Sequence, residues 1–485
     1  MRRPILNNIS LRAIESREAN ASPPLMERAG ASATQIALEM LADTSRAILV
    51  VAGPGNNGGD GFVMARLLKQ AGRNVTVAFC GDQDKLPPDA RQAHDAWQAT
   101  SGCTLSSFPD GDFGLIIDAL FGIGLARPIE GMARDWIERI NTAHCPVLSL
   151  DIPSGLNADT GIAAGPVVQA DCTASFIALK PGILTADGPD MCGKLIHCSL
   201  DIAITRVDGE EISPAHFHRH LKPRRRNSHK GSFGNVAIIG GASGMAGAAL
   251  LCGRAALKLG AGRVYVGMLD ALAVDPVQPE LMLRSAQDVA ALADVIAIGP
   301  GLGQSLQAGE LLSQSLECDK PLILDADALN LLTQGTVLLR KVAVRSAPTF
   351  LTPHPTEAAR LLDIRTEQVQ ADRLTSAKAL AQRFRAHVVL KGCGSIVVCP
   401  DGRWFINTTG NPGLASAGTG DVLTGVLAAL LAQGWEASAA LLAAVHLHGA
   451  AADYCVAQEI GPIGLTASEL INSARQILND WIAKA

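Results

Sequence analysis

The chain has 485 residues, a length that corresponds to two or three domains of ordinary size. Its composition of 48% hydrophobic and 18% charged residues excludes a disordered protein, and 48 glycines with only 4% aromatic residues suit an α/β protein with glycine loops better than a β-sandwich. The formal net charge of −5 excludes an overall basic field, so we expect neither nucleic acid nor a membrane surface as a partner.

The eleven cysteines and the N-terminus both favour a cytoplasmic protein. The cysteines are scattered from Cys80 to Cys455 without a CxxC pair, which is typical of reduced thiols rather than of a disulfide framework or a zinc site. The N-terminal segment MRRPILNNIS carries positive charge but no apolar stretch behind it, so we expect no export. The long apolar region 422–452 is interrupted by polar residues and glycine, which predicts two buried helices and no membrane span.

The first half of the chain repeats a pattern of strand, glycine turn and helix. An apolar run at 47–53 ends in GPGNNGGDG and is followed by the helical FVMARLLKQAG and the strand-like VTVAFC. This order predicts a βαβ unit with parallel strands. We expect further strands at 115–120, 146–152 and 174–179.

Hydrophobic periodicity stops between residues 201 and 231, in a segment rich in histidine and arginine. We expect a first domain at 1–215, a solvated basic linker at 216–230 and a second domain at 222–485. A phosphate-facing role for residues 228–231 is the alternative for the end of this segment. Beyond this segment the strand pattern returns, at 235–241, 263–268, 295–301, 321–327 and 387–392. Both domains should therefore be three-layer α/β/α folds that bind ligands beyond the carboxyl ends of their strands.

Polar residues follow the predicted strands of the first half. Five glycines at 53–61 let main-chain N–H groups approach a phosphate, although a tight turn without a ligand has the same composition. Asp118 and Asp151 end two strands, and with Asn57 and Ser154 they offer oxygen ligands to a monovalent or divalent cation. Taken singly, each of these residues also suits a helix cap or a turn.

The strings NNGGDG, DALFGIGL and DIPSGLNADTG resemble the YjeF N-terminal domain, the NAD(P)H-hydrate epimerase, over about residues 10–212. The resemblance implies a Rossmann-like fold and potassium ligands at Asn57, Asp118 and Ser154. It makes Asp151 a substrate-contacting acid and our candidate acid–base catalyst. The hydrated nucleotide is implied to contact Asn56, Asn57, Gly58, Gly59, Asp60, Gly122, Ile123, Gly124, Leu125, Ala126, Arg127, Pro128 and Asp151.

The second half carries the string SAGTGDVLTG at 416–425, before an apolar helix. Main-chain N–H groups at such a turn form an anion hole, and Asp421 beside them can take a proton from an attacking hydroxyl, which is what phosphoryl transfer to an alcohol requires. A simple helix cap is the alternative for Asp421. His354 stands between two prolines in a stiff loop, which favours a ligand-facing role over a core position.

GTGD before a helix, with TPHPTEA upstream, is similar to the ribokinase-like superfamily. Together with RRRNSHKGSFG, GMAGAA, GPGLG and KGCGS it resembles the ADP/ATP-dependent NAD(P)H-hydrate dehydratase from about residue 222 onward. The resemblance implies Mg²⁺ with ADP, and Asp421 as the catalytic base. The implied nucleotide contacts are Lys391, Gly392, Cys393, Gly394, Ser395 and Gly420. The implied contacts to the S-hydrate are Ala249, Gly303, His354 and Asp421.

Taken together, these resemblances predict a bifunctional repair enzyme for the hydrated nucleotides NADHX and NADPHX. The first domain would epimerise the R and S forms, and the second would dehydrate the S form while ADP becomes AMP and phosphate. Two alternatives remain open from the residues: a vitamin or sugar kinase fused to an unrelated α/β domain, and a non-enzymatic YjeF-like interaction module. We also expect a homo-oligomer.

Overall fold

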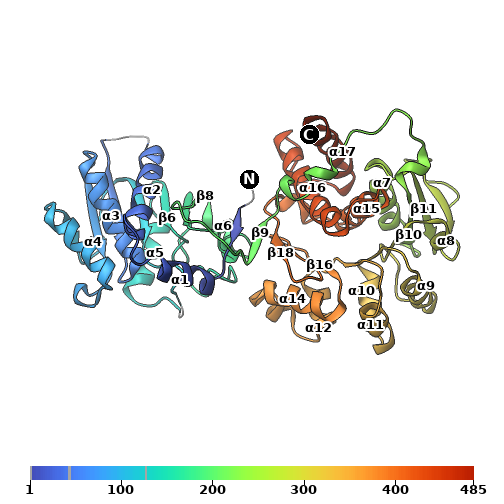
Figure 1. Ribbon diagram of the computed structural model, residues 1–485, viewed down its shortest axis with the longest axis horizontal. Coiled ribbons are helices and arrows are strands. Elements are labelled where there is room, and N and C mark those ends of the chain that lie inside the picture. Colours follow the sequence, from blue (N-terminus) through green and yellow to red (C-terminus); the bar gives the residue numbers. More distant parts are fainter. Residues whose placement is uncertain (1–2, 42–44, 126–127) are drawn as a thin grey trace. The chain divides into compact units, whose positions relative to one another are not determined.

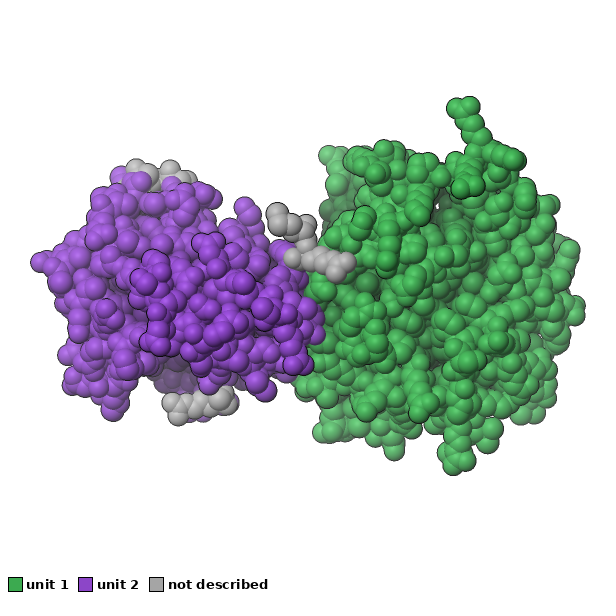
Figure 2. Space-filling model, in the orientation of Figure 1, with its two compact units in different colours: residues 1–2, 210–485 green, residues 3–209 purple. Residues whose placement is uncertain are grey.

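Each half of the chain folds around its own sheet (Figure 1). The computed structural model describes residues 3–41, 45–125 and 128–485, and these form two units, residues 3–209 and residues 210–485 (Figure 2). The two-domain α/β architecture expected from the sequence is confirmed.

The first unit contains a seven-stranded sheet in the order β4-β3-β2-β5-β6-β7-β8, and each neighbouring pair is parallel. Its strands are β2 (Ala47–Ala52), β3 (Val75–Phe79), β4 (Cys103–Leu105), β5 (Phe113–Ala119), β6 (Val147–Leu150), β7 (Cys172–Phe176) and β8 (Lys194–Cys198). Its helices are α1 (Asn8–Arg17), α2 (Leu25–Met40), α3 (Asn56–Gln70), α4 (Pro88–Ala99), α5 (Met132–Asn141) and α6 (Gly188–Cys192).

Alternating side chains of β2 separate the two layers that cover this sheet. Ile48 and Val50 pack into a core cluster shared with α1 to α4, whereas Leu49 and Val51 pack into a second cluster with α5. All four side chains have no exposed surface, as expected for a parallel strand covered on both faces. The continuous apolar run in the sequence is the direct result.

The second unit has the strand order β9-β18-β17-β16-β15-β14-β13-β10-β11-β12. Its strands are β9 (Gly209–Glu211), β10 (Asn235–Gly240), β11 (Arg263–Met268), β12 (Met282–Ser285), β13 (Val295–Ile298), β14 (Leu322–Leu324), β15 (Thr349–Leu351), β16 (His387–Leu390), β17 (Ile396–Val398) and β18 (Trp404–Ile406). Strands from β16 to β12 run parallel, and β16, β17 and β18 form an antiparallel meander.

Helices cover both faces of this sheet (Figure 1). One layer consists of α7 (Ala246–Lys258), α15 (Thr419–Ala432), α16 (Ala437–Ala457) and α17 (Ala467–Lys484), which share one core cluster with the sheet. The other layer includes α9 (Leu306–Glu317), α10 (Asp327–Leu332), α11 (Thr336–Ala343), α12 (Pro355–Leu362) and α14 (Arg373–Phe384). The shorter helices are α8 (Val289–Leu292) and α13 (Thr366–Ala371).

The apolar region near the C-terminus forms two core helices, α15 and α16. Among the described residues, α16 is the one helix long and apolar enough to cross a membrane, but 72% of its most apolar window is buried inside the protein. It packs against α15 and α17 within the core cluster. The prediction of two buried helices is therefore confirmed.

The segment expected to be a linker at 216–230 is only partly solvated. Phe217 has no exposed surface and lies 5.6 Å from the ring of Trp481 and 6.0 Å from that of His446, measured between ring centroids. Leu221 joins the same core cluster. Burial of these two apolar side chains fixes the first part of the segment to the second unit, while residues 222–232 are exposed as expected.

Candidate functional sites

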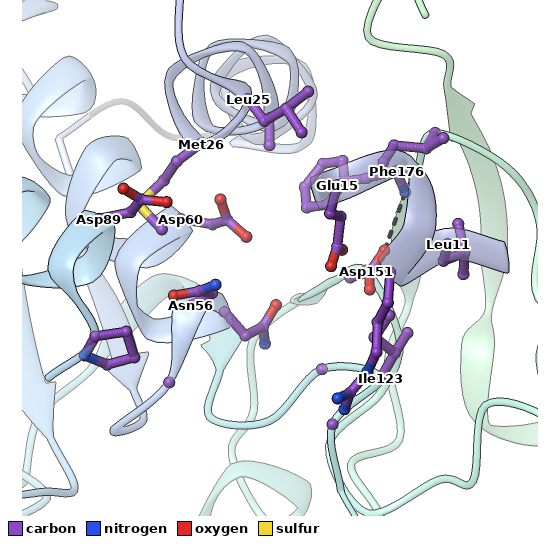
Figure 3. Close-up of a pocket in the computed structure, with 18 of the residues that line it drawn as sticks. Leu11, Glu15, Leu25, Met26, Asn56, Asp60, Asp89, Ile123, Asp151 and Phe176 are labelled. Atoms are coloured by element: carbon purple, nitrogen blue, oxygen red, sulfur yellow. Dashed lines mark hydrogen bonds between the residues drawn. The ribbon is translucent and has the colours of Figure 1, made fainter. Parts of the chain in front are cut away.

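A cavity of about 980 Å³ opens at the carboxyl ends of the strands in the first unit (Figure 3). Its walls come from the loops after β2, β5 and β6 and from helix α1. Many residues singled out in the sequence line it, although they come from separate loops. These are Asn56, Asn57, Asp60, Gly122, Ile123, Gly124, Leu125 and Asp151.

The other residues expected at this site have different surroundings. Gly58 and Gly59 are buried in the first turn of α3, where a Cβ atom would lie 1.9 Å from the Gly53 carbonyl oxygen and 2.5 Å from the Met26 side chain, respectively. These glycines allow close packing of the loop. Pro128 lines a smaller cavity of about 160 Å³ that shares Leu125 with the larger one. Ala126 and Arg127 lie outside the described residues.

Asp151 is paired with a buried lysine that the sequence motifs did not include. Lys180 donates a hydrogen bond to Asp151 Oδ1, and the Phe176 N–H donates to the same oxygen over 3.2 Å. The lysine Nζ also donates to Ser175 Oγ (3.1 Å) and to the Phe176 carbonyl (3.0 Å). A lysine inside the otherwise apolar run FIALKPGIL is the signal that would have identified it.

Glu15 on α1 and Asp60 on α3 are among the further carboxyl groups that line the cavity, together with Glu18, Glu27 and Asp89. Burial raises the pKa of Asp60 well above its ordinary value, and the charges of Asp151 and Glu15 add to the effect. Burial and the charge of Asp151 also raise the pKa of Glu15, although its side chain keeps some exposed surface. In Figure 3, Glu15 lies beside Asp151, and Asp60 faces both from the other side of the cavity.

Asp118 and Asn57 provide a chemically suitable donor set for a cation. Asp118 has no exposed surface, and its carboxylate accepts hydrogen bonds from the Ser154 N–H (2.9 Å), Ser154 Oγ (2.6 Å) and Ser149 Oγ (2.8 Å). Burial raises its pKa. The Asn57 amide oxygen is buried without a hydrogen-bond partner among the described residues, next to Gly122. The Asn57 amide nitrogen is also without a partner among the described residues. A buried amide oxygen without a partner and a buried carboxylate are both donors that suit a potassium ion.

The second site lies at the carboxyl ends of β14, β15 and β16, around the buried Asp325. One carboxylate oxygen accepts hydrogen bonds from Lys391 Nζ (3.0 Å) and Thr352 Oγ1 (2.8 Å), and the other accepts one from Thr424 Oγ1 (2.8 Å). Asp325 is 1% exposed. It therefore joins three neighbouring strand ends to helix α15, and the sequence motifs did not single it out.

Asp421 lies in the first turn of α15, beside this network. The helix begins after Gly418, whose φ of 88° is a left-handed conformation, and no side chain in the described part of the chain caps its first N–H groups. Burial and the charges of Asp325 and Asp327 raise the pKa of Asp421 to about 7, against the opposing charge of Lys391. The site thus combines an anion-binding helix end with a carboxyl group that titrates near neutral pH.

His354 is half exposed and caps helix α12. Its Nδ1 accepts a hydrogen bond from the Thr356 N–H (3.1 Å), and its own N–H donates to Glu357 Oε2 (2.8 Å). The expectation that this histidine lies outside the core is confirmed. Burial raises the pKa of Glu357 to about 7, whereas burial and the charge of Lys391 lower the pKa of His354.

The remaining residues predicted for the second site differ in their exposure and in their neighbours. The Gly303 N–H donates to Asp327 Oδ2 (2.9 Å), and the loop Lys391, Gly392, Cys393, Gly394 and Ser395 follows β16 with Gly392 and Cys393 exposed. Gly420 lies beside Lys391, since a Cβ atom there would be 3.3 Å from the lysine Nζ. Ala249 has no exposed surface and packs against Gly240 and Gly241, so its side chain supports the turn that follows β10.

Both halves of the chain match known protein families. Residues 236–475 match the family model of the NAD(P)H-hydrate dehydratase, and residues 22–182 match the YjeF-related protein N-terminus. The chain is 40% identical to the bifunctional NAD(P)H-hydrate repair enzyme Nnr of Escherichia coli (strain K12), over 94% of this chain and 89% of that protein. It is 38% identical to the Nnr enzyme of Coxiella burnetii, over 94% of each chain.

Solved structures support the dehydratase family match of the second half of the chain. The ADP/ATP-dependent NAD(P)H-hydrate dehydratase of Bacillus subtilis, co-crystallised with ATP and Mg²⁺, is 32% identical and has a TM-score of 0.50, with coverage of 56% of this chain and 98% of that one. A ribokinase-like superfamily protein from Enterococcus faecalis is 27% identical, with a TM-score of 0.51 and coverage of 58% and 99%.

Proposed function

The chain belongs to the family of bifunctional NAD(P)H-hydrate repair enzymes, and we propose how its two units divide the repair. The enzyme restores hydrated NADH and NADPH. We assign the interconversion of the R and S hydrates to the first unit. We assign removal of water from the S hydrate to the second unit, with ADP as the phosphoryl donor.

The observation that carries this proposal is the presence of two separate acid-containing sites at the strand ends of two α/β units. A dehydratase that accepts only the S hydrate would leave the R hydrate unrepaired. An epimerase on the same chain supplies the missing form. Each site alone explains half of the repair, and the two together explain all of it.

In the first unit we propose that the nucleotide occupies the large cavity and that Asp151 takes and returns a proton at the hydroxyl group of the ring carbon that is inverted. Lys180 holds the Asp151 carboxylate in one orientation. Asn57, Asp118 and Ser154 would hold the potassium ion. When bound, the ion supplies a fixed positive charge that offsets the buried carboxylate of Asp118.

In the second unit we propose that Asp421 takes the proton of the substrate hydroxyl, so that the oxygen attacks the terminal phosphate of ADP. The free N–H groups at the start of α15 and the ammonium of Lys391 stabilise the negative charge that develops. The carbon–oxygen bond of the resulting phosphate ester then breaks, inorganic phosphate leaves, and the neighbouring ring carbon loses a proton, which restores the ring double bond. Glu357 would hold Mg²⁺ through water, and the ion would supply charge neutralisation to the phosphates when bound.

The test is recovery of NADPH absorbance from a mixture of R and S hydrates, with the full chain, Mg²⁺, potassium and ADP. We expect a fast phase from the S hydrate and a slower phase from the R hydrate. Asp421→Ala should abolish both phases, and Asp151→Asn should abolish only the slow one. A stable phosphorylated product without recovered NADPH would instead indicate a kinase.

The same assay with ATP in place of ADP compares the two phosphoryl donors.

A cytoplasmic location and a homo-oligomeric state stay predictions from the sequence. Fractionation of cells tests the location, and sedimentation of the purified protein tests the oligomeric state.

A further inference from the structure

The large cavity of the first unit presents carboxyl groups from opposite walls. Asp151 follows β6 and is paired with Lys180, whereas Asp60 comes from the second turn of α3 (Figure 3). Both residues line the same cavity. A ligand bound between them therefore meets an acidic side chain on each side.

We infer that Asp60 is a second catalytic residue of the epimerase site, which exchanges a proton with the substrate from the side opposite Asp151. This inference rests on the proposed epimerase function of the first unit. It gives Asp60 a chemical role beyond contact with the nucleotide.

The two carboxyl groups have different environments. The Asp151 carboxylate accepts hydrogen bonds from the Lys180 ammonium and the Phe176 N–H, so its negative charge is compensated. The Asp60 carboxyl receives no hydrogen bond from the described residues around it, and burial and the charges of Asp151 and Glu15 raise its pKa while the charge of Lys180 lowers it. Burial among these acids raises the pKa of Asp60, so this group holds its proton more readily than an ordinary aspartate.

This difference suits an inversion at carbon. Environments that separate the proton affinities of two carboxyl groups create a proton donor and a proton acceptor in one site. A hydroxyl that leaves from one face of a ring needs a proton donor. Water that adds to the other face needs a proton acceptor. Asp60 and Asp151 supply them from the two walls.

In one direction of the reaction, the step begins at the departing hydroxyl. Asp60 gives its proton to the departing hydroxyl, the carbon–oxygen bond breaks, and its electron pair leaves with water. The lone pair of the ring nitrogen forms a carbon–nitrogen double bond. Water then adds to the opposite face, the double-bond pair returns to nitrogen, and Asp151 accepts the released proton. The reverse reaction, or exchange with solvent, resets the two carboxyl groups.

The full-length protein and the two-phase recovery assay provide the test. In Asp60→Asn we expect the slow phase, which reports the R hydrate, to fall by about a hundredfold or more, while the fast phase is unchanged. The matched control is Asp84→Asn, an aspartate of the same unit whose side chain is 84% exposed and lies outside the cavity. Thermal unfolding of both variants verifies that the first unit is folded, and Asp60→Glu tests rescue by a carboxyl group.

A second measurement follows the oxygen atom. In water enriched in ¹⁸O, the inference requires each inversion to introduce one solvent oxygen, after subtraction of the uncatalysed rate. Inversion without oxygen exchange would overturn it in favour of ring opening. An unchanged slow phase in folded Asp60→Asn would also overturn it, and loss of that phase in Glu15→Gln instead would transfer the role to Glu15. If wild type lacks both phases, the proposed function itself is wrong.

Discussion

Lys180 donates a hydrogen bond to Asp151 from a position where only 1% of the lysine side chain is exposed. The same ammonium is held by Ser175 Oγ and the Phe176 carbonyl, at the end of β7. Asp151 itself has a φ of 67°, a conformation that is uncommon outside glycine and asparagine. The ion pair thus holds a carboxylate in a fixed orientation on a strained turn at the wall of the cavity.

Lys180→Met should destabilise the first unit by about 3 to 5 kcal/mol, because it leaves the Asp151 carboxylate without its buried partner. We expect the slow, R-hydrate phase of NADPH recovery to be lost with it. The double variant Lys180→Met/Asp151→Asn should regain much of the stability, measured by thermal unfolding, without regaining the slow phase. Equal stability of the single and double variants would contradict the role of the pair.

Replacing potassium with tetramethylammonium should slow only the R-hydrate phase, because the buried Asn57 amide oxygen would lose the partner we propose for it. Potassium should also raise the thermal unfolding midpoint of the first unit in a concentration-dependent way, since an ion that binds only the folded state stabilises it. Asn57→Leu should remove both effects. A midpoint that is independent of potassium in wild type would argue against the site.

The dehydration step should lose rate as the pH falls through about 7, because Asp421 must be deprotonated to act as the base and its pKa is raised to about 7. Asp327→Asn removes one of the negative charges that raise this pKa, while the amide oxygen can still accept the Gly303 N–H. We therefore expect the acidic limb of kcat/KM for the S hydrate to move to lower pH. A shift to higher pH would contradict this electrostatic account.

Gly420→Ala should separate stability from nucleotide binding. Alanine is favoured over glycine in a helix by up to about 1 kcal/mol, so the unfolding midpoint should stay the same or rise. The new Cβ atom would lie 3.3 Å from Lys391 Nζ, at the proposed nucleotide site. We expect a higher KM for ADP with little change in the epimerisation rate. An unchanged KM would remove Gly420 from the nucleotide site.

His387→Phe should make the second unit less sensitive to acid. His387 stacks on Phe350 at 4.8 Å between ring centroids, its Nδ1 has no partner among the described residues, and burial lowers its pKa to about 4. An unfolded histidine titrates near 6.5, so wild type should lose up to about 3 kcal/mol of stability from this group as the pH falls from 6.5 to 4. Thermal unfolding across this range should show a smaller loss in the variant.

The strand ends were predictable from the sequence because parallel strands buried on both faces are continuous apolar runs, and glycines and acids follow them. The runs at 47–53 and 263–268 correspond to β2 and β11 almost residue for residue. The edge strand β4 and the short strands β17 and β18 were not predicted, since three residues carry too little periodicity to distinguish them from loops.

The partners of the site residues were not predictable in the same way. Lys180 lies 29 residues from Asp151, and Thr424 lies 99 residues from Asp325, so only the folded sheet brings them together. Neither pair has a characteristic spacing. Phe217 was assigned to a solvated linker because charged neighbours surround it in the sequence, yet one aromatic side chain is sufficient to bury that turn.

Helix α1 makes the epimerase cavity depend on the first residues of the chain. Its Asn8 donates to the Ile123 carbonyl and to Asp159, and Leu11 and Ile14 enter the core, so the helix is tied to the loops that follow β5 and β6. The match to the YjeF-related family begins only at residue 22, beyond this helix. A protein shortened to that boundary would keep the strings NNGGDG, DALFGIGL and DIPSGLNADTG and still have an open-sided cavity, with its dehydratase unit untouched.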